Sequence, residues 1–236
     1  MKTEKKTGLV REPTGFPDKS TFRPAAVIFD MDGLLFDTER LTFSFWAQAG
    51  KKFGYNINDD TVIRMIGISS ENSRAIFLEE FGDDFPYEEY RREFRLLCRR
   101  EFEKGIPHKK GLVYLLDRLC AAKIPLAVAT STRRATALEM LEKAGVLNRF
   151  AATACGDEVT NGKPAPDIFL LAAEKLMTHP SLCAGFEDSP AGLQGLHAAG
   201  IRSVFIKDII EPPQEILSTV WRRCGDLAEA AELFGI

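Results

Sequence analysis

Two aspartates, Asp30 and Asp32, come directly after the short apolar run Ala26–Phe29. The run is rich in β-branched and aromatic residues, which favours a buried strand of a parallel sheet over a helix. Parallel sheets bind ligands just beyond the carboxyl ends of their strands. Two carboxylates crowded there need a cation or a proton to relieve their repulsion. The spacing therefore indicates metal-assisted chemistry.

The same residues allow two other interpretations. Asp32-Gly33 is a turn dipeptide and could simply close a loop. The Asp-x-Asp pattern also begins the EF-hand calcium loop, but that loop places its glycine later and ends in a glutamate. Here Gly33 comes too early and the apolar segment Leu34–Phe36 follows, which excludes the calcium loop. Turn formation and chemistry both stay open from this motif alone.

Polar side chains also follow three later apolar runs. Thr130 ends the second predicted strand, and Ser131 follows it. Lys163 lies beyond the third predicted strand. Glu187 and Asp188 come at the end of the fourth. Each has an ordinary alternative, because hydroxyls and carboxylates cap helices and lysines occupy solvated loops. The carboxyl ends of parallel strands lie on one edge of a sheet, however, so these residues can converge with the two aspartates. Their joint placement predicts a single site.

This set of side chains suits phosphoryl transfer. Carboxylate oxygens can hold Mg²⁺, which keeps room for water and a phosphate oxygen. A lysine neutralises charge on the phosphate, and a hydroxyl donates to another of its oxygens. One aspartate can act as the covalent nucleophile, and a second can act as general acid and then as general base.

The composition restricts the class of protein. The net charge of -3 argues against general nucleic-acid binding. No apolar stretch approaches membrane-spanning length, and the first residues lack the apolar segment of a signal peptide. Five cysteines are scattered without C-x-x-C spacing: Cys98, Cys120, Cys155, Cys183 and Cys224. Reduced thiols and a cytoplasmic location fit best. We expect a monomer or weak homo-oligomer with no nucleic-acid or membrane partner.

Apolar runs that suit buried strands alternate along the chain with segments of helical periodicity. We predict strands at Ala26–Phe29, Pro125–Thr130, Ala151–Cys155, Leu182–Phe186 and Ser203–Ile206. This alternation predicts an α/β fold with a doubly wound, Rossmann-like parallel sheet. Residues 211–235 are predicted to close the chain with helices.

The segment between the first two predicted strands is much longer than one crossover helix requires. Its apolar residues recur at helical spacing throughout. We interpret residues 39–109 as a smaller all-helical domain inserted over the strand end that carries the aspartates. Residues 21–38 and 110–236 then form the core domain, and the polar residues 1–20 form a flexible tail.

Four motifs carry a family resemblance. They are D-M-D-G-L-L-F-D-T-E from Asp30, the strand-ending Thr130, G-K-P-A-P-D from Gly162 and F-E-D-S-P-A-G from Phe186. In order and spacing they resemble the haloacid dehalogenase superfamily of hydrolases, and within it the group of sugar phosphatases and β-phosphoglucomutases with a helical cap domain. Haloacid dehalogenases proper lack an aspartate at the position of Asp32, so the resemblance makes dehalogenation the poorer fit.

The resemblance implies roles for the acidic residues. Asp30 matches the nucleophile and contributes an oxygen to Mg²⁺. Asp32 matches the acid/base residue, with its backbone carbonyl on the metal. Asp188 matches the remaining metal-binding aspartate, and Glu187 matches an acidic neighbour that ligates or orients the metal shell.

The resemblance also implies how a small phosphorylated metabolite is held. Thr130 and Lys163 match the phosphate-binding hydroxyl and lysine, with Ser131 beside them. Mutases of this group usually carry a histidine where this chain has Thr42, and an arginine where Ser70 falls. Both departures favour hydrolysis of the aspartyl-phosphate by water.

We therefore predict a Mg²⁺-dependent phosphatase acting on a sugar phosphate or a nucleoside monophosphate. The D-T-E-R-L run and the C-terminal E-L-F-G also resemble pseudouridine-monophosphate phosphatases. A β-phosphoglucomutase-type mutase is the alternative. A third hypothesis is a non-catalytic module that binds a phosphorylated ligand. The presence of the acid/base residue Asp32 argues against it.

The inserted segment contains several arginines. One group alternates with glutamates and predicts a solvated helix face: Arg91, Arg92, Arg95, Arg99 and Arg100. Better candidates for substrate contact are Arg40, Arg64, Arg74 and the turn 67–72. In the core, Thr132 and Arg133 follow the predicted phosphate-binding turn; contact with substrate is one interpretation, and the start of a helix is the favoured one.

Overall fold

The computed structural model describes residues 22–65 and 70–234, and the predicted tail of residues 1–20 lies outside this range. Within it, the strands are β1 (Ala26–Phe29), β2 (Leu126–Thr130), β3 (Ala152–Cys155), β4 (Cys183–Glu187), β5 (Arg202–Ile206) and β6 (Arg222–Cys224). They form one parallel sheet in the order β3-β2-β1-β4-β5-β6. The first strand therefore lies in the middle, between β2 and β4.

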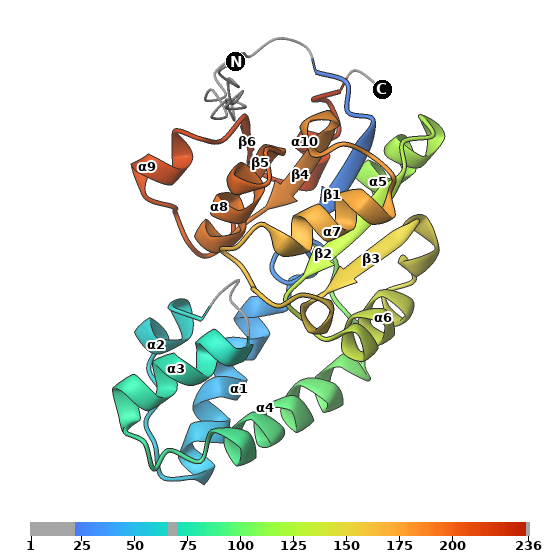
Figure 1. The fold of residues 1–236 in the computed structure, drawn as a ribbon. Coiled ribbons are helices and arrows are strands. Elements are labelled where there is room, and N and C mark those ends of the chain that lie inside the picture. Colours follow the sequence, from blue (N-terminus) through green and yellow to red (C-terminus); the bar gives the residue numbers. More distant parts are fainter. Residues whose placement is uncertain (1–21, 66–69, 235–236) are drawn as a thin grey trace, which may run out of the picture.

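Helices separate and follow these strands. They are α1 (Glu39–Lys52), α2 (Asp59–Ile63), α3 (Ser70–Phe81), α4 (Tyr87–Phe102), α5 (Leu112–Ala121), α6 (Arg134–Lys143), α7 (Asp167–Lys175), α8 (Pro190–Ala198), α9 (Gln214–Leu217) and α10 (Leu227–Ala230). Figure 1 shows α5 to α10 around the sheet, and α1 to α4 grouped beyond one of its edges.

Both faces of the sheet are buried because successive side chains of a strand point to opposite sides. Val27 and Phe29 of β1 pack in an apolar cluster with α5, α6 and α10. Ala26 and Ile28 pack in a second cluster with α7 and α8. All four side chains are fully buried. A central strand covered on both sides is nearly continuously apolar, which is the pattern that the sequence shows.

The helices α1 to α4 have an apolar core of their own. Trp46 stacks on Phe94 with ring centroids 3.8 Å apart, and Phe77 and Tyr90 pack against Trp46. The hydroxyl of Tyr90 donates to the backbone carbonyl of Trp46 at 3.1 Å. The predicted fold class, a doubly wound sheet with an inserted helical cap, is thus confirmed. The limits of 39–109 for that insertion stay a prediction.

The two chain segments that connect the cap to the core run side by side. The backbone N–H of Asp37 donates to the carbonyl of Pro107 at 2.9 Å, and that of Lys109 donates to Leu35 at 2.9 Å. The ammonium of Lys109 lies 3.0 Å from Asp37 and 2.7 Å from Asp208, which follows β5. These two ion pairs hold both connecting segments against the core domain.

The C-terminal part of the chain corrects one sequence prediction. Residues 211–235 were expected to be helical, but the structure places β6 between two short helices, α9 and α10. Arg222 and Arg223 pair with Val204 and Phe205 of β5, and Cys224 is buried. An edge strand with two arginines lacks the apolar signal that identifies a buried strand. Among the described helices, none combines the length and apolar character needed to cross a membrane.

Candidate active site

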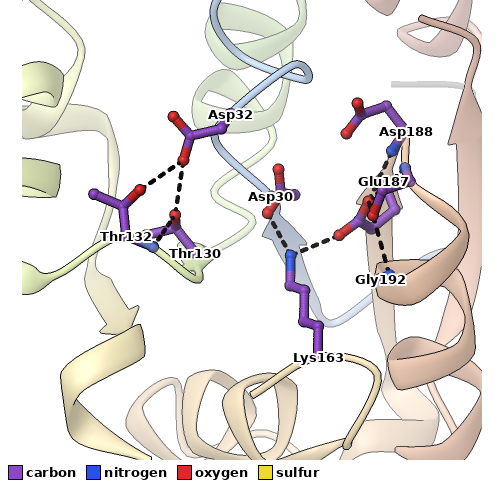
Figure 2. A network of polar contacts seen from close by, with 9 residues as sticks. Asp30, Asp32, Thr130, Thr132, Lys163, Glu187, Asp188 and Gly192 are labelled. Carbon is purple, nitrogen blue, oxygen red and sulfur yellow. Dashed lines mark hydrogen bonds and ion pairs between the residues drawn. The ribbon is translucent and has the colours of Figure 1, made fainter. Parts of the chain in front are cut away.

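The polar residues predicted from the strand ends meet at one edge of the sheet (Figure 2). Asp30 follows β1, Thr130 ends β2 and Glu187 ends β4. Because β1 pairs with β2 on one side and β4 on the other, Asp30 has a neighbouring strand end on each flank. Lys163 enters from the loop before α7 and reaches the same point. The strand order therefore brings Asp30, Thr130 and Glu187 together, and the loop before α7 adds Lys163.

Lys163 connects the carboxylates of β1 and β4. Its ammonium donates to Asp30 Oδ1 in a short contact and to Glu187 Oε1 at 2.6 Å. The side chain is 1% exposed, and its ammonium lies 4.9 Å from the centroid of the Phe169 ring. Burial opposes the charge, but the attraction of Asp30 and Glu187 outweighs it and holds the pKa of Lys163 above its usual value. Lys163 thus carries a permanent buried charge.

Glu187 is held rigidly by the turn that follows β4. Its Oε2 accepts hydrogen bonds from the backbone N–H groups of Asp188 and Ser189, each at 2.9 Å, and from the Ser189 hydroxyl at 3.0 Å. The N–H of Gly192 in turn donates to that hydroxyl at 3.1 Å. A Cβ atom at Gly192 would clash with the Glu187 carboxylate. The glycine is therefore needed because α8 approaches Glu187 so closely.

Asp32 belongs to a separate hydrogen-bonded group (Figure 2). Its Oδ2 accepts from the Thr130 hydroxyl at 3.1 Å and from the Thr132 hydroxyl at 2.9 Å. The backbone N–H of Thr132 donates to Thr130 Oγ1 at 3.0 Å, which fixes the two threonines relative to each other. Gly33, with φ +83°, makes the turn beyond Asp32. Burial raises the pKa of Asp32 despite the hydrogen bonds from both threonines.

Thr132 is a site residue that sequence reasoning placed elsewhere. It was predicted to start a helix, but α6 begins at Arg134, and the Thr132 side chain turns back to Asp32. The available signal was its position two residues beyond Thr130, in a T-S-T run at a strand end. The predicted phosphate ligand Thr130 is fully buried and also contacts Asp32. Ser131, its neighbour, lines the cavity in front of the site.

Three buried carboxylates form a candidate metal site. Asp30, Glu187 and Asp188 each offer an oxygen, and these oxygens lie within 4.8 Å of one another. Two of them, Asp30 and Glu187, pair with the buried ammonium of Lys163. Burial, with help from Glu187 and Asp32, raises the pKa of Asp30 well above its usual range although Lys163 acts against the shift. Excess negative charge and hard oxygen donors fit Mg²⁺.

A cavity of about 490 Å³ extends from Asp30 and Asp32 toward the cap. Its lining includes four arginines of α4: Arg91, Arg92, Arg95 and Arg99. As predicted for a solvated face, Arg92, Arg95 and Arg99 are exposed, whereas Arg91 is half-buried; all four also line the cavity, and Arg100 does not. Charge alternation along a helix shows which face is polar. It does not show whether that face meets bulk water or a cavity.

Among the other cap candidates whose side chains the structure describes, Arg64 and Arg74 do not line the cavity. Arg64 forms an exposed ion pair with Glu79 at 2.6 Å, and Arg74 is exposed. The side chains of Arg40, Thr42 and Ser70 lie outside the described part of the chain, as do residues 66–69 of the turn. In the core, Cys155 is a fully buried small residue, and burial raises the pKa of its thiol to about 11.

A carboxylate at the end of a central parallel strand, a buried lysine beside it and a cap over the site define a phosphoryl-transfer hydrolase. The family model described as haloacid dehalogenase-like hydrolase matches residues 27–206. The chain belongs to this family.

Two relatives and one solved structure are similar to the chain over most of its length. A phosphorylated carbohydrates phosphatase of Thermotoga maritima is 33% identical over 180 residues, covering 76% of this chain and 83% of that protein. A probable pseudouridine-5'-phosphatase of Drosophila melanogaster is 34% identical over 191 residues, covering 77% and 80%. The crystal structure of CbbY from Rhodobacter sphaeroides in complex with phosphate is 25% identical, with a TM-score of 0.76 over 87% of this chain and 96% of that one. The chain is a phosphoric monoester hydrolase of this family.

Proposed function

We propose that this protein is a cytoplasmic, Mg²⁺-dependent phosphatase that hydrolyses a sugar phosphate or a nucleoside monophosphate through an aspartyl-phosphate on Asp30. The observation that carries the proposal is that two carboxylates at one cavity are held by different partners. Asp30 is paired with a buried ammonium, whereas Asp32 is held by two threonine hydroxyls. One carboxylate is thus placed to attack, and the other to move a proton.

In the first step, a carboxylate oxygen of Asp30 attacks phosphorus and the P–O bond to the alcohol breaks. Asp32 gives its proton to the departing alcohol oxygen. Lys163, fixed between Asp30 and Glu187, places a positive charge beside the transferring group. We assign Ser131 and Thr130 as hydroxyl donors to the phosphate. The cavity position of Ser131 supports its part in this.

In the second step, water attacks phosphorus and the bond to Asp30 breaks. Asp32 takes the proton from that water, which returns both aspartates to their starting states and releases inorganic phosphate. The hydrogen bond from Thr132 keeps Asp32 in one orientation through both steps, which leaves the single hydroxyl hydrogen of Thr130 to turn from Asp32 to the phosphate. The cap, residues 39–109 in our assignment, contributes part of the cavity lining and would exclude bulk water.

Asp30, Asp188 and the backbone carbonyl of Asp32 would hold the metal. Bound there, Mg²⁺ would neutralise charge on the phosphate oxygens. Both carboxylate oxygens of Glu187 already accept hydrogen bonds. We therefore assign Glu187 to the orientation of Lys163 and of the neighbouring ligand, Asp188.

The test is a phosphate-release assay across sugar phosphates and nucleoside monophosphates, with and without Mg²⁺. Asp30→Asn should abolish turnover, by at least about 10³-fold, because an amide oxygen cannot form the phosphoenzyme. Its circular dichroism should match that of the unchanged protein. Near-normal activity of Asp30→Asn would overturn the mechanism.

The same assay separates the alternatives. Interconversion of glucose 1- and 6-phosphates that is faster than phosphate release would assign the protein to the mutases. Binding of inorganic phosphate without hydrolysis of any ester, p-nitrophenyl phosphate included, would indicate a non-catalytic module. Hydrolysis that is independent of Mg²⁺ would contradict the metal assignment.

A further inference from the structure

The part of the cavity lining that comes from α4 is rich in positive charge. Arg91, Arg95 and Arg99 recur every four residues along α4 and therefore lie in one stripe, about 6 Å apart along the helix axis. All three line the cavity that also contains Asp30 and Asp32. The described part of the chain outside the cap adds two further cations to this lining, Arg133 and Lys143.

Few carboxylates are available to balance these charges. Apart from Asp30 and Asp32, Glu139 is the one acidic residue among those that line the described cavity. Glu139 already pairs with Lys143 at 2.9 Å and lies 3.8 Å from Arg99. The outer cavity is therefore basic in a chain whose net charge is -3.

The three arginines of the stripe differ in their contacts. Arg99 reaches toward α6 through Glu139. Arg91 packs its guanidinium 5.2 Å from the Trp46 ring centroid and 5.6 Å from that of Phe94. Arg95 lies between them and is exposed, and no ion pair joins it to another residue of the described ranges.

Arg91 and Arg95 also repel each other. Burial lowers the pKa of Arg91, and the positive charge of Arg95 contributes to that shift. A guanidinium packed on aromatic rings has lost part of its water, so an anion placed beside it restores favourable interactions. An anion between the two arginines would remove their repulsion.

We propose that Arg95, supported by Arg91, binds a second anionic group on the alcohol part of the substrate. The preferred substrates would then carry a phosphate or a carboxylate in addition to the phosphate that Asp30 attacks. This inference rests on the proposed function and narrows its substrate class. Trp46 and Phe94 stack on each other with Arg91 over them, so this wall offers the leaving group a guanidinium beside the rings.

The position of Arg95 suits a small metabolite. Arg99 approaches the core helix α6, and α4 runs from there away from the sheet (Figure 1). Arg95 therefore lies about 6 Å farther along α4 from this contact with the core than Arg99 does. A second anionic group would have to be several bonds from the transferred phosphate, as it is in a bisphosphorylated sugar or in a phosphorylated short-chain acid.

The experiment compares matched substrate pairs by their kcat/KM values. Fructose 1,6-bisphosphate against fructose 1-phosphate tests a second phosphate. The pair 3-phosphoglycerate and glycerol 3-phosphate tests a carboxylate. The unchanged protein is measured beside Arg95→Gln, Arg95→Lys and the matched control Arg100→Gln, which changes an arginine of the same helix outside the cavity.

We expect the unchanged protein to prefer the doubly anionic member of at least one pair by about tenfold or more. Arg95→Gln should lower kcat/KM for that member by about ten- to hundredfold and change the singly charged member by less than about threefold. Arg95→Lys should retain part of the preference, and Arg100→Gln all of it. A preference in the fructose pair identifies the second anion as a phosphate, and a preference in the glycerate pair identifies it as a carboxylate.

Two results would overturn the inference while the proposed function stands. One is hydrolysis by the unchanged protein without preference in either pair. The other is an equal loss on both members of a pair in Arg95→Gln, which would show a general effect on the site. Failure to hydrolyse any phosphomonoester would instead overturn the proposed function, and this inference with it.

Discussion

The catalytic edge of the sheet and the arginine stripe of α4 both face one cavity, but they hold their charges differently. At the sheet edge, Lys163 and Glu187 are at most 1% exposed, and each makes several short hydrogen bonds. On α4, Arg95 and Arg99 are exposed, and the structure gives only Arg99 an ion pair. Charges fixed by buried networks are preorganised for a reaction step. Charges on long, solvated side chains can adapt to different ligands.

The two sets of charged residues also differ in the structure that holds them in place. Behind the catalytic residues are parallel strands whose positions are set by backbone hydrogen bonds along β1, β2 and β4. Behind the arginines is a cluster of aromatic rings centred on Trp46 and Phe77. Directional hydrogen bonds fix positions more tightly than apolar packing does. This contrast agrees with a constant reaction in the core and a substrate preference set by the cap.

The largest expected effect tests whether the cap depends on its aromatic core. Trp46→Ala removes the ring that stacks on Phe94. We expect it to lower the free energy of unfolding, for the unit that contains the cap, by about 3–5 kcal/mol. Urea unfolding followed by circular dichroism measures this. The control Val113→Ala, at a side chain 45% exposed on α5, should change it by less than about 1 kcal/mol. Equal effects of the two substitutions would contradict a separate cap core.

A smaller effect tests the orientation of Asp32. Thr132→Val keeps the shape of the side chain but removes the hydroxyl that donates to Asp32 at 2.9 Å. We expect kcat to fall about tenfold, with KM nearly constant, because the acid/base carboxyl loses one of its two positioning bonds. Thr132→Ser, which restores the hydroxyl, should recover most of kcat. A change confined to KM would instead assign Thr132 to substrate binding.

The smallest effect concerns the connections between the two regions. Lys109→Met should lower the free energy of unfolding by about 1 kcal/mol at neutral pH, because Lys109 pairs with Asp37 and Asp208. Burial lowers the pKa of Lys109, but the hydrogen bonds that its ammonium donates to Asp208 and Asp37 outweigh this effect and leave that pKa raised.

The sign of the pH dependence follows from that raised pKa. The contribution of Lys109 is fully present below the pKa of lysine in the unfolded chain, and it disappears as pH rises through the higher folded pKa. The difference between Lys109→Met and the unchanged protein should therefore shrink above about pH 10.5. Denaturant unfolding from neutral to alkaline pH measures it, and a constant difference would contradict the ion-pair explanation.

Part of this architecture is predictable because it depends on local patterns. Short apolar runs ending in Asp30, Thr130 and Glu187 identify buried parallel strands, and parallel strands align their carboxyl ends. The helical insertion is visible because the gap after the first strand exceeds the length of one crossover. Strand β6 was missed because an edge strand with two arginines carries no apolar pattern.

The amino-acid sequence by itself determined the sheet, the inserted helices and the set of polar residues at the strand ends, since strand burial and helical periodicity are encoded by near neighbours. Tertiary structure alone decided what each of these residues contacts. The hydrogen bond from Thr132 to Asp32 joins residues that are 100 positions apart in the chain. The same holds for the arginines of α4, since only the packing of the cap on the core turns that helix face toward the catalytic aspartates.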